Sequence, residues 1–182
     1  MRTANGPSWQ VRVDVPEVLQ FAAYIGEREG FASPGSRPPC QPAEAEWTDW
    51  WNSLVTQAVE SAGPAIDPPE FHSLAARPHL RDLCGRYWGD FADDWRETKM
   101  PLARRVQDQV LALSLQDIVR EREKALGRRV SDFSLRLDFV RWPRDYRWDV
   151  SDRHVVLGVA YLEAGQVGAT RAIVAARIAQ LA

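Results

Sequence analysis

A helix rich in tryptophan is predicted between Ala43 and Gly63. Its large apolar side chains limit the folds that this chain can adopt. Its apolar positions recur at steps of three and one residues, which is the spacing of the buried stripe of an amphipathic helix. These positions are Trp47, Trp50, Trp51, Leu54, Val55, Ala58 and Val59. Because one indole buries on the order of 200 Å², we expect the rest of the chain to pack around this helix.

Length and composition favour a single globular domain over residues 1–182. The chain has 45% hydrophobic and 26% charged residues, close to the average for folded globular proteins. Prolines gather near residues 31–42 and 63–70, and such segments do not form regular secondary structure. We interpret both as surface loops, because the residues before the first loop are too few to form a core of their own.

Hydrophobic periodicity predicts several further helices. One covers residues 18–29, and a second, rich in aromatic residues, covers 79–97. A third begins at Pro101, a residue suited to the first turn of a helix, and continues to about residue 126 because no Gly or Pro interrupts it earlier. The last helix is predicted near the C-terminal end of the sequence, with Ile173 and Ile178 inward.

Three segments have the patterns of strands. Apolar and polar residues alternate over 9–15 and 135–139, as in half-buried strands, and residues 154–162 form an apolar run typical of a fully buried strand. We interpret the residues between the last two strands as one long hairpin loop. The predicted fold class is α+β, mainly helical, with a small, mostly antiparallel sheet of about three strands packed on aromatic-rich helices.

Charge is nearly balanced overall but unevenly distributed. The formal net charge is -2 at pH 7, which gives no general attraction to nucleic acid or anionic membranes. Residues 43–97 include eleven acidic and four basic residues, whereas residues 98–182 include ten acidic and fifteen basic ones. Two oppositely charged regions could face each other within the fold or face charged partners outside it, but the interpretation we favour is a surface on which these charges average out.

The sequence lacks the signals of export, membrane insertion and metal binding. It has neither a secretory leader at its start nor an apolar run of about 18 residues, so we expect a soluble cytoplasmic protein that does not contact membranes. Cys40 and Cys84 are the two cysteines, and the three histidines have no metal-site spacing. We expect free thiols, no metal and no other cofactor.

Arginine and aromatic residues alternate in the predicted hairpin loop. Arg, Trp and Tyr are the residue types that dominate protein interfaces, and the same mixture is found on nucleic-acid surfaces, where rings stack on bases. The candidate contact residues are Arg141, Trp142, Arg144, Tyr146, Arg147 and Trp148. The interspersed aspartates favour another interpretation, in which Arg–Asp pairs and Arg–Trp stacking only stiffen the loop.

A second candidate surface is the acidic face of the predicted helix 79–97. Asp90, Asp94 and Glu97 lie on this face along about two turns of the helix, and a basic partner would complement their charge. Arg86 shares this face, which favours a solvated surface over a divalent-metal site.

Histidine chemistry provides an alternative of another class. His72, His79 or His154 would act as an acid or base in an aromatic-lined pocket, with arginines orienting an anionic substrate. Cys84 lies on an apolar helix stripe, so we interpret it as a core thiol and not as a nucleophile. His154 is expected at a strand edge.

The sequence favours a binding protein without catalytic activity, such as an adaptor, an accessory subunit or an immunity-type inhibitor. Its partner is expected to be another protein, contacted through the Arg/Trp hairpin, the acidic helix face or both. A homodimer is also compatible with the sequence. The histidine-dependent enzyme and the nucleic-acid binder are the two alternatives.

Overall fold

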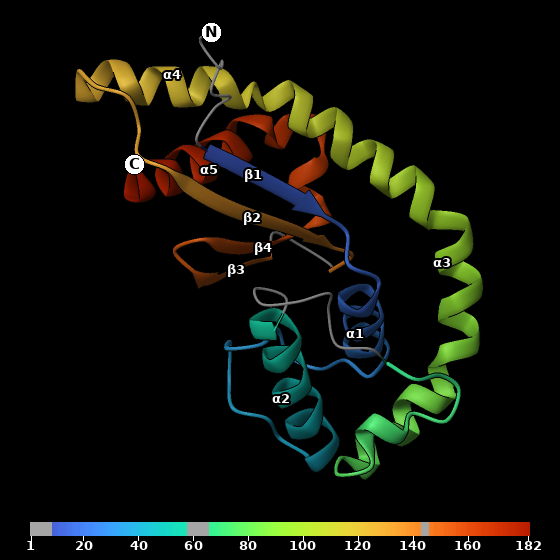
Figure 1. Ribbon diagram of the computed structural model, residues 1–182. Coiled ribbons are helices and arrows are strands. Elements are labelled where there is room, and N and C mark those ends of the chain that lie inside the picture. Colours follow the sequence, from blue (N-terminus) through green and yellow to red (C-terminus); the bar gives the residue numbers. More distant parts are fainter. Residues whose placement is uncertain (1–8, 58–65, 143–145) are drawn as a thin grey trace, which may run out of the picture.

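The computed structural model describes residues 9–57, 66–142 and 146–182 (Figure 1). The main elements are β1 (Trp9–Asp14), α1 (Glu17–Arg28), α2 (Pro42–Gln57), α3 (Pro78–Leu113), α4 (Leu115–Leu126), β2 (Phe133–Val140), β3 (Arg147–Ser151), β4 (His154–Gly158) and α5 (Val167–Leu181). Three short 3-10 turns, η1 (His72–Leu74), η2 (Val159–Leu162) and η3 (Ala164–Gln166), complete the described structure.

The chain is α+β and mainly helical, but its sheet differs from the prediction. Four strands lie in the order β1-β2-β4-β3, with β1–β2 and β2–β4 parallel and β3–β4 antiparallel. The predicted hairpin loop contains a strand of its own, β3. The chain therefore reverses direction twice between β2 and β4 and not once, which makes these two strands parallel and the sheet mostly parallel.

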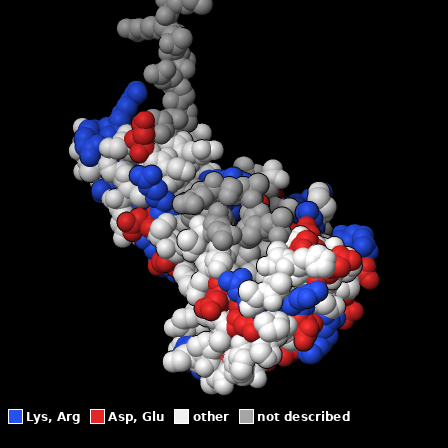
Figure 2. Space-filling model, turned by 60° about the horizontal axis from the view of Figure 1, so that its bottom comes forward, with Lys and Arg blue, Asp and Glu red and all other residues white. Residues whose placement is uncertain are grey.

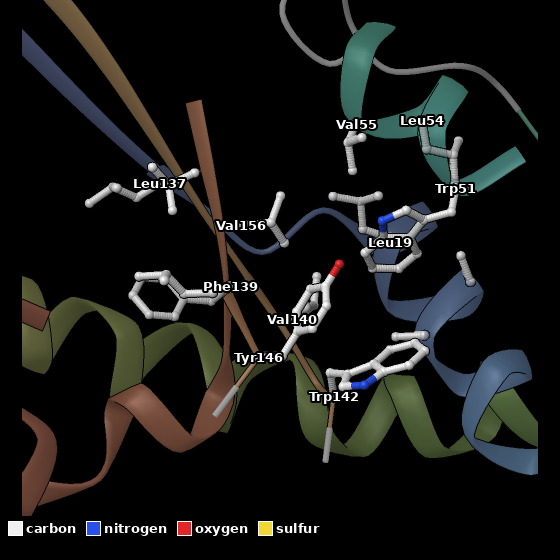
Figure 3. Close-up of a cluster of buried hydrophobic side chains, with 14 of the residues drawn as sticks. Leu19, Trp51, Leu54, Val55, Leu137, Phe139, Val140, Trp142, Tyr146 and Val156 are labelled. Carbon is white, nitrogen blue, oxygen red and sulfur yellow. The ribbon is translucent and has the colours of Figure 1, made fainter. Parts of the chain in front are cut away.

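Of the two central strands, β4 is buried along its whole length, and β2 is buried on both faces over residues 137–140. On β2, Leu135 and Leu137 point to one face and Val140 to the other, and all three are fully buried. Continuous apolar burial of this kind is usual for parallel strands covered on both sides. α5 and the second half of α3 pack on the first face, and the helix pair α1–α2 meets the second face near its carboxyl end (Figures 1 and 3).

The tryptophan stripe on α2 is confirmed from Trp47 to Val55. Trp47, Trp50 and Trp51 are buried, together with Leu54 and Val55. Ala58 and Val59, the last two predicted members of the stripe, lie outside the described residues. The indoles of Trp47 and Trp51 lie 5.8 Å apart, and α2 packs against both α1 and α3.

α3 is one continuous helix of 36 residues, so the predicted break before Pro101 is wrong. A proline inside a helix removes one backbone hydrogen bond, here to the carbonyl of Glu97. Both residues are on the exposed side of α3, where water can satisfy that carbonyl. The helix ends instead at Leu113, because Ser114 adopts a left-handed conformation with φ of 50°.

Because α3 is long, it connects the helix pair α1–α2 to the sheet and α5. Its first half packs on α1 and α2, and its second half reaches α5 and strand β1 (Figure 1). None of the helices within the described ranges is both long enough and apolar enough to cross a membrane.

Candidate functional site

The aromatic part of the predicted hairpin is inside the protein. Trp142 and Tyr146 are only 5% and 8% exposed. The Trp142 ring lies 5.6 Å from Trp47 and 5.7 Å from Trp51, between the sheet and α2 (Figure 3). Burial also raises the pKa of the Tyr146 phenol. These two rings belong to the core, so neither offers a stacking platform for nucleic-acid bases.

Arg141 connects the two predicted contact surfaces to each other. Its guanidinium pairs with the carboxylate of Asp94 on α3 and donates a 3.0 Å hydrogen bond to Thr98. The side-chain amide of buried Gln20 donates to the carbonyl of Phe139 at 2.6 Å and accepts from the backbone N–H of Arg141 at 2.9 Å. Arg141 and Asp94 therefore already form an ion pair with each other within the same chain.

Of the remaining hairpin residues, Arg147 is exposed and Trp148 is half-buried. Arg147 pairs with Asp149 at 2.8 Å, and Asp149 also pairs with Arg177 of α5 at 2.7 Å. Partial burial of Asp149 opposes ionisation, but these two guanidinium groups outweigh it and hold the pKa of the carboxyl below its usual value. Arg144 lies outside the described residues.

The acidic face of α3 remains at the surface. Asp90 and Glu97 are exposed, whereas the nearby Asp93 pairs with Arg96 at 2.8 Å. On the side of the molecule shown in Figure 2, acidic and basic side chains of the described residues are intermixed. The uneven distribution of charge along the sequence therefore does not produce a large patch of one sign on that side.

His154 is buried and not at a strand edge, because β3 and β2 flank β4 on its two sides. Its Nε2 lies 2.9 Å from the Asp138 carboxylate, which also accepts from Nε of Arg136 at 2.9 Å. His154 and Asp138 are 1% and 0% exposed, and Nδ1 of His154 has no hydrogen-bond partner within the described ranges. This cluster was not predicted from the sequence, although strand alternation does place Arg136 and Asp138 on one face.

The other histidines and the buried thiol do not form an acid–base site together. His79 contacts the Glu46 carboxylate at 2.7 Å on the surface, and His72 is exposed. Burial raises the pKa of the Cys84 thiol to about 12, so it is protonated at neutral pH. Across the described ranges, no group of three or more His, Cys, Asp and Glu side chains is placed to hold a metal ion.

A groove that the sequence did not reveal lies between β1 and α3. It encloses about 370 Å³, at the lower end of the range for binding pockets. Val13 and Val15 form one wall, and Ala103, Val106 and Val110 form the other. The groove is mainly apolar but open to solvent, so its walls remain available for contact.

Two large apolar side chains extend this groove outward along α3. Met100 and Leu111 are each 70% exposed, and they are the exposed large hydrophobic residues of the described chain. Leu111 lines the groove directly, and Met100 lies one turn before Ala103 on the same side of the helix. At one end, Lys99 of α3 pairs with Glu17 of α1 at 3.3 Å.

Strand β1 forms the edge of the sheet beside the groove. It pairs with β2 along its whole length, and no strand in the described part of the protein pairs with its other side. Gln10 and Arg12 are exposed, whereas Val11 and Val13 are only half-buried. An edge strand offers unpaired backbone N–H and C=O groups to an added strand.

Comparison with known proteins identifies no relative. The chain matches no family model, no curated protein and no solved structure.

Proposed function

We propose that this protein is a soluble cytoplasmic binding protein without catalytic activity, which acts as an adaptor, an accessory subunit or an immunity-type inhibitor. The observation that carries this proposal is the open groove between β1 and α3, with Met100 and Leu111 exposed along it. Burial of large apolar side chains is a main driving force of protein association. A contact at this groove would remove both side chains from water.

The groove and the edge of β1, which pairs with no second strand in the described part of the chain, favour one mode of contact. An extended segment of a partner protein adds to the edge of the sheet by backbone hydrogen bonds, and alternate side chains of that segment enter the groove. The groove does not have a strong charge of one sign, because one acidic residue, Asp14, and one basic residue, Lys99, both line it. The partner segment is therefore expected to be apolar on one face and mixed in charge on the other.

A peptide-selection experiment tests this proposal. Extended peptides are selected from a random displayed library against the protein, and their affinities are measured by fluorescence anisotropy. We expect Leu111→Glu to weaken binding by at least about tenfold, because it places a carboxylate at the apolar wall. The matched control is Ala112→Glu, which adds the same charge at the next residue, an exposed position that is turned about 100° around α3 from Leu111 and does not line the groove. Equal affinities for the two variants would remove the groove from the proposed function.

The exposed residues of the two predicted surfaces are a further proposed contact region. Asp90 and Glu97 on α3 form no ion pair with the described residues, and Arg147 and Trp148 are accessible on β3. A basic partner would complement Asp90 and Glu97. Charge reversal at both positions should then reduce the association rate and its salt dependence.

A histidine-dependent enzyme is the second candidate function. It is favoured by the contact between His154 and Asp138 and by Nδ1 of the imidazole, which has no hydrogen-bond partner among the described residues. Because His154 is only 1% exposed, a substrate would need an opening of the fold to reach it. This alternative is tested by adding small anionic compounds to the protein in solution and following the His154 ring signals in NMR spectra.

A further inference from the structure

We propose that the segment bound at this groove is strand β1 of a second copy of the chain, so that two sheets join antiparallel in a symmetric dimer. This inference rests on the proposed function, because it names the occupant of the same groove. Dimers with twofold symmetry are the commonest protein oligomers, and their interfaces must be complementary to themselves. The charges and the apolar residues of β1 meet that requirement in one register.

The charges select the register. When Val13 lies on the twofold axis, Arg12 of each copy stands opposite Asp14 of the other. Opposite charges at directly facing positions stabilise an antiparallel pair, whereas like charges destabilise it. A register centred on Arg12 or on Asp14 places two like charges opposite each other, and one centred on Val11 pairs Arg12 with Gln10. Within the strand, centring on Val13 is thus the arrangement that forms ion pairs, and it forms two.

The monomer already shows that these two side chains are free to exchange partners. Arg12 and Asp14 pair with each other at 3.3 Å along the same strand, and their side chains are 63% and 40% exposed. Such an exposed pair contributes little to the stability of one chain. Replacing it with two equivalent pairs across the axis therefore costs the monomer little.

The apolar residues support the same register. Val13 of β1 and Val15, just after the end of the strand, line the groove, and Val11 points to the same face as Val13 because side chains alternate along a strand. With Val13 on the axis, Val13 faces its own copy and Val11 faces Val15 of the other chain. The apolar layer of one sheet then continues into the next.

The helix beside β1 completes the proposed interface. On α3, Leu102 is buried in the core, Ala103, Val106 and Val110 form the wall of the groove, and the exposed Leu111 also lines it. In the dimer the two copies of α3 approach each other on one face of the joined sheet. Their outer apolar side chains would be covered by the second copy and not by water.

Sedimentation equilibrium measures the oligomeric state of the full chain directly. The wild type should have twice the 20.6 kDa mass of one chain at a protein concentration of about 100 μM, which corresponds to a moderate affinity. Arg12→Asp and Asp14→Arg should each weaken the dimer at least about tenfold, because each places two like-charged pairs across the axis. The matched control is Arg120→Asp on α4, where an arginine that is also highly exposed pairs with Asp117, and this variant should remain dimeric.

Mixing the two single variants gives the decisive result. An equimolar mixture of Arg12→Asp and Asp14→Arg should form a heterodimer, since every facing pair is again of opposite charge. The double variant R12D/D14R should dimerise for the same reason. Because Asp14 also accepts from the backbone N–H of Val15 at 2.8 Å, circular dichroism must first show that the Asp14 variants fold. If they do not, R12D/D14N removes the like-charged contact without an added arginine and should recover the dimer.

A wild type that is monomeric at about 100 μM, or single variants that stay dimeric, would overturn this inference. So would a mixture that remains monomeric although both variants are folded. These outcomes leave the proposed function standing, because a segment of a different protein could still occupy the groove. The proposed function fails separately if the peptide affinities do not distinguish Leu111→Glu from Ala112→Glu.

Discussion

The two edge strands of the sheet, β1 and β3, are protected to different degrees. β3 has five residues, and its register with β4 shifts between Asp149 and Ser151. Arg147, Asp149 and Arg177 form ion pairs beside it. β1 has six residues paired in regular register with β2, and its half-buried valines lie next to an apolar groove.

This difference indicates that a partner strand can add to the sheet at β1 and not at β3. Short edge strands, irregular register and charged side chains are features that keep proteins from pairing edge to edge. β3 has all three features, whereas β1 has a single exposed Arg–Asp pair that is complementary to itself. Single substitutions can alter the two edges separately.

The largest effect is expected where the chain approaches β3. Trp142→Ala removes a buried indole that packs on Trp47 and Trp51, and should lower the free energy of unfolding by about 3–5 kcal/mol. Urea denaturation measures the loss. The matched control is Trp148→Ala, a half-buried ring on β3 itself, which should cost clearly less. Equal losses would show that Trp142 does not anchor this edge.

The next effect concerns the hydrogen bonds that hold the chain between β2 and β3. Gln20→Leu keeps the approximate size of the side chain but leaves the carbonyl of Phe139 and the N–H of Arg141 without their partner. We expect a loss of about 1–3 kcal/mol in the free energy of unfolding. Gln10→Leu, at an exposed position on β1, serves as the control and should change it by no more than about 0.5 kcal/mol. A similar small change for both variants would contradict the role given to Gln20.

These interactions show what local sequence patterns can and cannot reveal. The buried stripe on α2 was predictable because helical spacing brings Trp47, Trp51 and Val55 to one side whatever the rest of the chain does. The direction of β4 was not, since it depends on how many times the chain reverses after β2. The position of Trp142 was ambiguous because aromatic residues dominate both protein cores and interfaces.

The groove was beyond sequence analysis for a related reason. Its walls come from β1 and from the middle of α3, which are far apart in the chain, and only their packing creates the space. The expected break at Pro101 also hid the single long helix that forms one wall. The sequence did contain one signal, because Met100 and Leu111 are large apolar residues that add to the apolar surface of α3. A stripe of apolar residues wider than the core can cover indicates an additional contact.

A smaller effect tests the charges that protect β3. The folded-state pKa of Asp149 is lowered, so its contribution to stability is present above the ordinary value of 3.8 and is lost as the pH falls through the folded-state pKa. Because this side chain is 39% exposed, solvent screening limits that contribution to less than about 1 kcal/mol. Asp149→Asn should remove it at neutral pH and reduce the loss of stability on acidification. Denaturation of both proteins at neutral and acidic pH measures the difference. An unchanged pH dependence would contradict this role of the ion pairs.

The smallest effect on folding is expected at β1, where the effect on assembly is largest. Arg12 is exposed and pairs only with Asp14 among the described residues, so Arg12→Asp should change the free energy of unfolding of the single chain by no more than about 0.5 kcal/mol. The measurement must be made at a protein concentration low enough for the wild type to be monomeric, because dimerisation itself adds apparent stability. At higher concentration the melting temperature of the wild type should rise with concentration, while that of Arg12→Asp should stay constant. A concentration-dependent rise in both would mean that the chains associate elsewhere, and that the open edge of β1 is not what brings them together.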